Sequence, residues 1–110
     1  MSDLNKSIIN ALENLKGQEI VTLDVSQLSD VMDTLIIASG TSSRHARSLA
    51  ENLVEETKKA GFRALGIEGL ETGDWVLVDY GDTVVHVMQD ETRNYYELEK
   101  LWSMKPANRQ

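Results

Sequence analysis

His86 and Asp79 are the two side chains whose types and spacing could do chemistry together. Both belong to the stretch 72–88, which reads T-G-D-W-V-L-V-D-Y-G-D-T-V-V-H-V-M. A carboxylate can hold an imidazole in the orientation of a general base. With Asp82 as a third ligand, the same groups could instead bind a metal ion. No motif places a serine nucleophile beside His86 and the chain has no cysteine, so we favour a packed or interface histidine.

Two strands joined by a tight turn must position these side chains. Gly81-Asp82 predicts a type II′ hairpin turn, which pairs Leu77 with His86. Side chains alternate between the faces of a strand. Asp79 and His86 then share one face as diagonal neighbours, about 7–8 Å apart at the backbone. The opposite face fits a core because it carries four β-branched residues: Val76, Val78, Val85 and Val87.

An aromatic surface is expected around this hairpin. Trp75 and Tyr80 flank the strand that holds Asp79, and tryptophan and tyrosine are the residues that most often anchor protein interfaces. We expect Trp75, Asp79, Tyr80 and His86 to gather at one patch, in which Asp79 or Asp82 meets basic groups of a partner. Packing in the core is the alternative role for the tryptophan.

The last predicted helix offers a second set of contact residues. Tyr95, Leu98 and Trp102 recur at i, i+3 and i+7, so they lie on one side of a helix. They either complete the contact surface or cover the core of the sheet. Asp90 or Thr92 is the expected N-cap of this helix.

The rest of the chain predicts a mixed α/β fold. Apolar residues at helical spacing indicate one helix that ends near Gly17 and another that follows residue 43. Strands are expected at 19–25, 32–38 and 62–69. With the hairpin and last helix, the order is α-β-β-α-β-β-β-α.

A mixed five-stranded sheet flanked by about three helices follows from this order. The strands on either side of the second helix should run parallel, joined by a right-handed crossover. A chain of 110 residues fits a single domain. We assign that domain to residues 1–103 and expect residues 104–110 to be a frayed polar tail.

The turn before the second helix, Ser39-Gly40-Thr41-Ser42-Ser43, has two interpretations. The free N–H groups of a helix N-terminus can bind phosphate, and Arg44, His45 and Arg47 would supply positive charge. The turn lacks the Lys of a P-loop and the spacing of a dinucleotide-binding loop. We favour helix capping for the serines and threonine and a solvated face for the basic residues.

Composition and charge restrict the classes of partner. Eleven Lys and Arg against 18 Asp and Glu give a net charge of −7, which opposes direct binding to a nucleic-acid backbone and suits a basic protein. No apolar run reaches the length of a membrane span. The N-terminus shows neither a signal peptide nor a transit peptide. We therefore expect a cytoplasmic protein that binds neither membranes nor a specific nucleic-acid sequence directly.

Several segments carry a resemblance to the Iojap family, also called ribosomal silencing factor RsfS. They follow in order over about residues 4–102, with one departure at 29–33, where an aromatic residue would be expected after the acid. The first half matches at Asp24-Val25, Ser29-Asp30 and Ile36 to His45. The second half matches at Glu68-Gly69, Gly73 to Asp82, Val84 to Val87 and Arg93 to Trp102.

The resemblance implies a fold related to the nucleotidyltransferases, without an established catalytic activity or cofactor. It implies binding to the large ribosomal subunit through a ribosomal protein at the joining face, the fourteenth of the large-subunit series. The bound factor would block association with the small subunit and lower translation when nutrients are short. Family relatives self-associate, so the resemblance also implies a possible homodimer. Organelle relatives carry leader segments, so this chain resembles a bacterial form.

A nucleotide-binding enzyme of nucleotidyltransferase type is the rival function. Such an enzyme needs a Gly-Ser turn that opens a helix and paired acids on a neighbouring strand for Mg²⁺. Here the turn reads Ser39-Gly40-Thr41, and Asp79 and Asp82 lie at the end of the hairpin. We therefore predict a protein that is not an enzyme.

Overall fold

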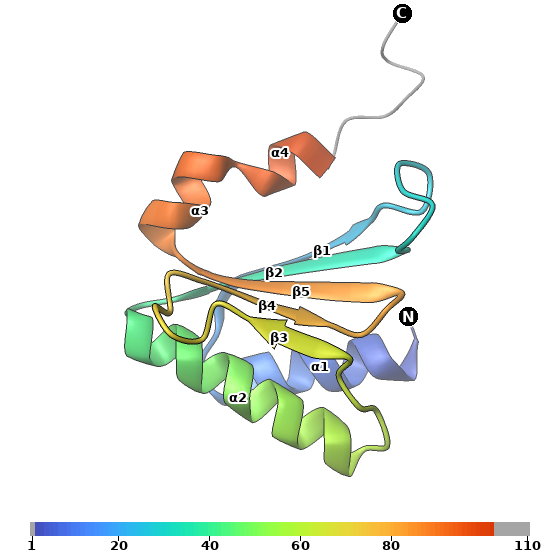
Figure 1. Ribbon diagram of the computed structural model, residues 1–110, viewed down its shortest axis with the longest axis horizontal. Coiled ribbons are helices and arrows are strands. Elements are labelled where there is room, and N and C mark those ends of the chain that lie inside the picture. The colour runs from blue at the N-terminus through green and yellow to red at the C-terminus, as the bar shows by residue number, and fades with distance from the viewer. Residues whose placement is uncertain (1, 103–110) are drawn as a thin grey trace, which may run out of the picture.

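The computed structural model describes residues 2–102 (Figure 1). The predicted tail at 104–110 and the domain boundary at residue 103 lie outside the described residues, so both stay predictions. The elements follow in the order α1 (Asp3–Asn14), β1 (Gln18–Asp24), β2 (Thr34–Gly40), α2 (Ser43–Lys59), β3 (Gly66–Glu68), β4 (Trp75–Asp79), β5 (Thr83–Gln89), α3 (Asp90–Tyr96) and α4 (Leu98–Trp102).

The five strands form one mixed sheet in the order β1-β2-β5-β4-β3. β2 and β5 are parallel, and the other neighbouring strands are antiparallel. The strands on either side of α2 do run in the same direction, as predicted, but they are not neighbours. The hairpin places β5 beside β2 and β4 next to it, which leaves β3 at the sheet edge. The predicted strand 62–69 is correspondingly short, because only Gly66–Glu68 pairs with β4.

The hairpin forms with the predicted register. Asp79 pairs with Val84 and Leu77 with His86, and Tyr80 N donates to Thr83 O at 2.9 Å across the turn. Gly81 has φ +94°, a conformation that glycine adopts without strain and that the first central residue of a type II′ turn requires.

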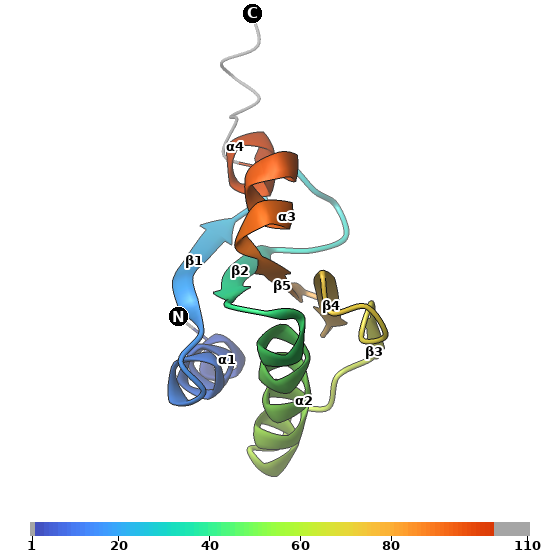
Figure 2. The same ribbon diagram turned by 90° about the vertical axis from the view of Figure 1, so that its left-hand side faces the viewer.

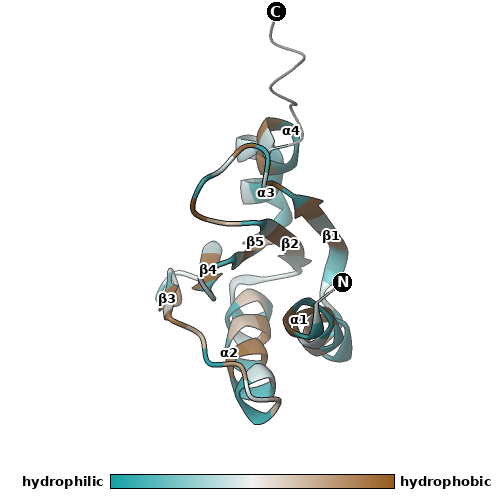
Figure 3. Ribbon diagram, turned by 90° about the vertical axis from the view of Figure 1, so that its right-hand side faces the viewer, coloured by the Kyte–Doolittle hydropathy of each residue, from teal (hydrophilic) through white to brown (hydrophobic). Residues whose placement is uncertain are grey.

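Two helices cover one face of the sheet (Figures 1 and 2). Ser2 caps α1 by accepting a bond from Asn5 N at 3.1 Å, and Ser42 caps α2 by accepting from His45 N at 3.0 Å. Both helices bury an apolar stripe, and in Figure 3 the hydrophobic side of α1 faces α2. This larger core contains Ile8, Leu12, Ile36, Leu49, Leu53 and the four hairpin valines.

The opposite face of the sheet is covered by α3, α4 and parts of the β1–β2 connection. A smaller core lies here, formed by Val25, Leu35, Ile37 and Met88. Leu98 and Trp102 of α4 pack against it. In Figure 2, α3 and α4 lie on the side of the sheet away from α1 and α2. Trp75 of β4 packs against the same core and is half-buried.

The predicted single last helix is two short helices. Glu97 adopts a left-handed conformation with φ 50° and separates α3 from α4. The predicted cap is also wrong, since Gln89 is the N-cap residue and makes no side-chain capping bond. β5 runs directly into α3 at this point, and Asp90 and Glu91 lie in its first turn, where negative charge interacts favourably with the helix dipole.

Within residues 2–102, no helix is long and apolar enough to cross a membrane.

Candidate partner-binding surface

His86 lies in the middle of the sheet face that carries α3 and α4. It stands between Leu77 of β4 and Ile37 of β2, and the residue is only 7% exposed. Burial lowers the pKa of the imidazole from 6.5 to about 4, because a charged ring loses hydration there. The ring is therefore neutral near pH 7.

The partner of His86 is Trp75, one strand away. The indole Nε1–H donates to His86 Nδ1 at 2.8 Å, and the two ring centroids are 5.8 Å apart. An indole N–H is a donor only, so Nδ1 must be the unprotonated nitrogen and the proton of the neutral ring resides on Nε2. This bond occupies Nδ1, so the general-base pairing of His86 with Asp79, which the sequence left as the less favoured alternative, is not the arrangement observed.

Asp79 bonds to the backbone of the hairpin turn instead of to His86. Its Oδ1 accepts a bond from Gly81 N at 2.7 Å, which is the local turn that aspartate commonly makes with its own backbone two residues on. The carboxylate thus stabilises the II′ turn. Asp79 and His86 share a face, as alternation predicts, but the short aspartate side chain bonds to the turn.

Two tyrosines extend the aromatic surface from Trp75 onto α3. The ring of Tyr96 lies against Trp75 with centroids 4.8 Å apart, and Tyr95 meets Tyr96 edge-on at 4.9 Å. Tyr96 is 53% exposed and Tyr95 is 80% exposed. We call the four residues His86, Trp75, Tyr96 and Tyr95 the aromatic row, because each contacts the next. Tyr96 is the member that sequence analysis missed.

Tyr80 lies on the opposite face and does not join the predicted patch. Its hydroxyl is 2.7 Å from the Thr57 hydroxyl of α2, and its ring packs against the larger core under the helices. Burial raises the pKa of this hydroxyl. Strict alternation from Val78 would have placed Tyr80 here, so the signal was present in the sequence.

The three residues predicted to share one side of the last helix have different environments. Leu98 and Trp102 pack against the smaller core, whereas Tyr95 points to solvent. The i, i+3, i+7 relation fails because Glu97 interrupts the helix between Tyr95 and Leu98. Of the two roles that the sequence left open for Trp102, covering the core is the one observed for its half-buried side chain.

Arg93 fixes α3 and α4 to the sheet, a role that sequence analysis did not anticipate. Its side chain is only 7% exposed. Nη1 donates to Ser39 Oγ of β2 at 2.8 Å, and Nε and Nη2 donate to the Glu99 carboxylate at 3.0 and 2.9 Å. Arg93 thereby lowers the pKa of Glu99. No local spacing rule connects an arginine before a helix break with an acid after it.

Asp82 lies exposed at the tip of the hairpin, away from the aromatic row. Its backbone oxygen accepts bonds from Asp33 N at 2.7 Å and Thr34 N at 3.1 Å. Beside it is a surface pocket of about 450 Å³, and Thr83 Oγ1 donates to Asn5 Oδ1 at 2.9 Å. Among the described residues, no three His, Cys, Asp or Glu side chains are grouped so that they could hold a metal ion.

The N-terminus of α2 is occupied by bonds within the chain. Thr41 N donates to His45 Nδ1 at 2.9 Å, and His45 Nε2 is 2.8 Å from Leu15 O of the loop after α1. His45 therefore links the β2–α2 connection to the α1–β1 connection and is not part of a solvated basic face. A Cβ on Gly40 would be 2.8 Å from Ala46 N, so this glycine allows β2 and α2 to approach. These contacts disfavour a phosphate site.

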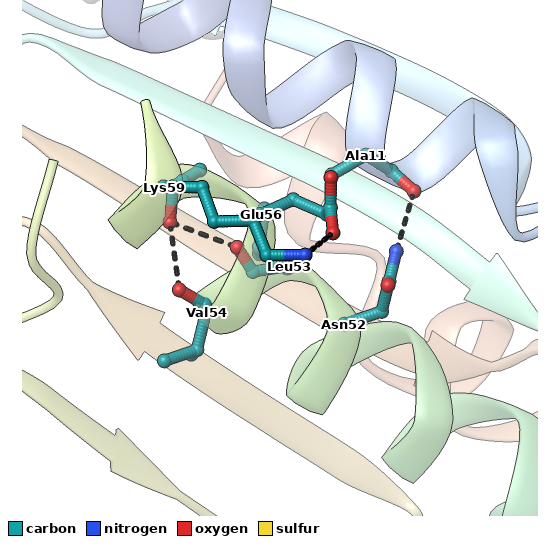
Figure 4. A network of polar contacts seen from close by, with 7 residues as sticks. Ala11, Asn52, Leu53, Val54, Glu56 and Lys59 are labelled. Atoms are coloured by element: carbon teal, nitrogen blue, oxygen red, sulfur yellow. Dashed lines mark hydrogen bonds and ion pairs between the residues drawn. The ribbon is translucent and has the colours of Figure 1, made fainter. Parts of the chain in front are cut away.

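A polar groove of about 510 Å³ lies between α1 and α2, and Figure 4 shows polar contacts of the same two helices. Asn52 Nδ2 donates to Ala11 O at 3.4 Å, and Lys59 pairs with Glu56 at 3.2 Å. That ion pair is exposed, so it contributes little to stability. The groove holds no group that sequence analysis assigned to a partner.

The family model described as "Ribosomal silencing factor during starvation" matches residues 1–110. The chain belongs to this family. The Haemophilus influenzae ribosomal silencing factor RsfS is 48% identical over 96 residues, which cover 87% of this chain and 94% of that protein. A crystal structure of a Chromobacterium violaceum protein is 44% identical and superposes with a TM-score of 0.90, covering 96% of this chain and 91% of the other.

Membership in the silencing-factor family confirms the resemblance that the sequence segments indicate. More distant relatives include the Mus musculus protein named "Mitochondrial assembly of ribosomal large subunit protein 1", 36% identical over 101 residues. Those residues cover 89% of this chain and 44% of the mouse protein. The mixed five-stranded fold is confirmed as well, whereas its relation to the nucleotidyltransferases stays a prediction.

Proposed function

We propose that the protein binds the large ribosomal subunit and prevents the small subunit from joining it. The partner on the large subunit would be a basic ribosomal protein at the joining face, the fourteenth of its series. Membership in the ribosomal silencing factor family is the observation that carries this proposal. The proposal includes a cytoplasmic location, where the factor and the ribosome meet.

Charge supports a basic protein as the direct partner. The chain carries a net charge of −7, which attracts basic proteins and repels the phosphates of ribosomal RNA. A ribosomal protein that contacts RNA offers the required positive surface. The acidic groups then guide association and exclude bare RNA as the main contact.

The aromatic row supplies the short-range contacts of this proposal. Tyr95 and Tyr96 are exposed beside Trp75, and such residues dominate the binding energy of protein interfaces. Asp79 is a diagonal neighbour of His86, the buried member of the row. Leu98 and Trp102 contribute by holding α4 against the sheet, while Tyr80 and Asp82 lie apart from the row and are weaker candidates.

Cosedimentation tests the binding step. Purified protein is centrifuged with isolated large subunits, with isolated small subunits, and alone. We expect the protein to pellet with large subunits only. A parallel titration with a nucleoside triphosphate and Mg²⁺ tests the enzyme alternative. Nucleotide binding or turnover without ribosome binding would replace the proposed function.

A further inference from the structure

The bond between Trp75 and His86 orients an indole that the sheet alone does not enclose. Trp75 is half-buried, and the ring of Tyr96, a residue that is 53% exposed, contacts it. Its Nε1–H has one acceptor, His86 Nδ1, at 2.8 Å. A donor that loses its only acceptor in a partly dry site must rotate toward water or stay unsatisfied. The orientation of Trp75 therefore depends on the imidazole.

His86 is a well-fixed acceptor. It lies on β5, a strand bonded on both sides, between Ile37 and Leu77. Its 7% exposure leaves little room for another rotamer. Only the neutral ring with its proton on Nε2 presents a lone pair at Nδ1, and burial favours the neutral ring.

The packing of Tyr96 and Tyr95 depends on the position of the indole. Tyr96 contacts Trp75 with centroids 4.8 Å apart, and Tyr95 contacts Tyr96 at 4.9 Å. A rotation of the indole would remove the surface against which Tyr96 packs. A buried residue on the central sheet thus controls the shape of an exposed aromatic surface.

We propose that His86 is a positioning residue for partner binding, whose Nδ1 fixes the Trp75 indole in the orientation that the partner contacts. This inference rests on the proposed function, because it assigns a role within the same surface. His86 itself stays beneath the surface and acts through Trp75. Its contribution is a hydrogen-bond acceptor at one atom, which distinguishes it from a residue that only fills space.

Nuclear magnetic resonance tests the geometry without any ribosome. Trp75 and Trp102 are the two tryptophans of the chain, so Trp102→Phe assigns the two indole N–H signals. Long-range proton–nitrogen spectra of the wild-type protein should show His86 protonated at Nε2 and unprotonated at Nδ1. The opposite tautomer near pH 7 would overturn the proposal, and this measurement needs no variant of His86.

Paired variants separate the acceptor from the volume of the side chain. His86→Leu removes the acceptor at similar size, whereas His86→Asn retains an oxygen near the position of Nδ1. We expect His86→Leu to shift the Trp75 indole signal and to weaken binding to large subunits by roughly fivefold, the usual effect of one lost hydrogen bond. His86→Asn should recover most of the binding. Equal binding by the wild type and the Leu variant would overturn the positioning role.

A double-mutant cycle locates the effect at the indole. Trp75→Phe has no N–H to orient, so His86→Leu should weaken binding no further in that background. An additional loss of the full size would mean that His86 acts independently of Trp75, which contradicts the proposal. If the wild-type protein fails to bind large subunits, the proposed function itself fails, while the indole spectra still decide whether His86 orients Trp75. Melting curves confirm that each variant folds.

Discussion

At the scale of single residues, His86 makes the stability of the protein depend on pH. The folded state lowers its pKa from 6.5 to about 4, so between these values the unfolded chain binds more protons. Stability therefore rises with pH in this window. Above pH 6.5 the imidazole is neutral in both states and costs no stability. As the pH falls toward 4, protonation of the unfolded chain increasingly destabilises the folded state.

Chemical unfolding at pH 7 and at pH 4.5 measures this effect. We expect a loss on the order of 2 kcal/mol over that interval from His86. The asparagine side chain of His86→Asn does not titrate, so the stability of this variant should change less over the same interval. Equal pH dependence in both proteins would assign the effect to other groups.

Asp79 combines a structural bond with a negative charge, and two substitutions separate them. Asp79→Lys reverses the charge beside the aromatic row and should weaken large-subunit binding by on the order of 1–3 kcal/mol, because like charges then face each other. Asp79→Asn retains the oxygen that accepts from Gly81 N and changes only the charge. Its loss of binding should be smaller. Cosedimentation measures both.

Trp75→Ala is the second substitution that tests this surface, because it removes the aromatic ring of β4. Unchanged cosedimentation of Asp79→Lys combined with Trp75→Ala would contradict the assignment of the surface to β4. Melting curves distinguish lost contacts from a damaged turn.

The sequence predicts the residues of the hairpin better than those of the aromatic row. Alternation and the Gly81-Asp82 turn are local, so they determine the register and the buried valines. The bond from Trp75 to His86 depends on rotamers, which no spacing records. The same holds for Arg93, because buried arginines are rare and its partners Ser39 and Glu99 lie on other elements.

At the scale of elements, the C-terminal helices show why the prediction of boundaries failed. The residues 90–102 contain neither Gly nor Pro, so nothing in the sequence marks a break at Glu97. Packing decides it, because Leu98 and Trp102 reach the smaller core only when the chain turns after α3. Tyr96 then points toward Trp75, and Tyr95 points to solvent.

The bond between Arg93 and Glu99 should hold this turn in place. Arg93→Met leaves Glu99 without its partner and removes the bond to Ser39. Breaking a buried pair costs several kcal/mol, but the Glu99 side chain is 35% exposed and solvent reduces that cost. We therefore expect a destabilisation of about 1–3 kcal/mol. Hydrogen exchange should accelerate in α3 and α4 before other elements.

Arg93→Lys is the comparison for that variant. Lysine keeps the charge but cannot make the two parallel bonds to Glu99, so its effect should be intermediate. Unchanged protection of α3 and α4 in Arg93→Met would contradict the role of the ion pair.

A substitution at Gly40 tests whether β2 and α2 must approach as closely as they do. A Cβ there would be 2.8 Å from Ala46 N, and backbone atoms cannot move aside as a flexible side chain can. Gly40→Ala should destabilise the protein by about 1–3 kcal/mol. Gly66→Ala is the matched control, since a Cβ at Gly66 has no neighbour within 4 Å. Equal melting temperatures would show that the sheet and helix adjust.

At the scale of the whole molecule, the proposed mechanism is occupancy of the joining face. The described elements form one sheet with helices on both sides (Figure 2). The aromatic row lies on the side that carries α3, where Trp75 packs against the smaller core and Tyr96 contacts it. A factor bound by that side covers part of the large subunit. The sequence predicts this arrangement in outline, since the order of elements gives the sheet and its two faces. The sequence did not predict that α3 and α4 are two short helices, and their length decides how much of their face of the sheet they cover.

Occupancy has a thermodynamic consequence that light scattering can measure. If factor and small subunit compete for the large subunit, each lowers the apparent affinity of the other by the same factor. Adding the protein before the subunits meet should strongly inhibit joining. Adding it to joined ribosomes should have little effect, because the site is covered. Excess small subunit should displace the factor.

The two orders of addition therefore distinguish occupancy from other mechanisms. The variant Asp79→Lys is the control, since a protein that binds weakly should lose inhibition in proportion to its lost affinity. Rapid splitting of joined ribosomes would indicate an active mechanism. Slower translation with unchanged joining would place the effect at a later step. Inhibition only before joining, relieved by small subunits, requires nothing more than a bound domain that occupies the surface the small subunit needs.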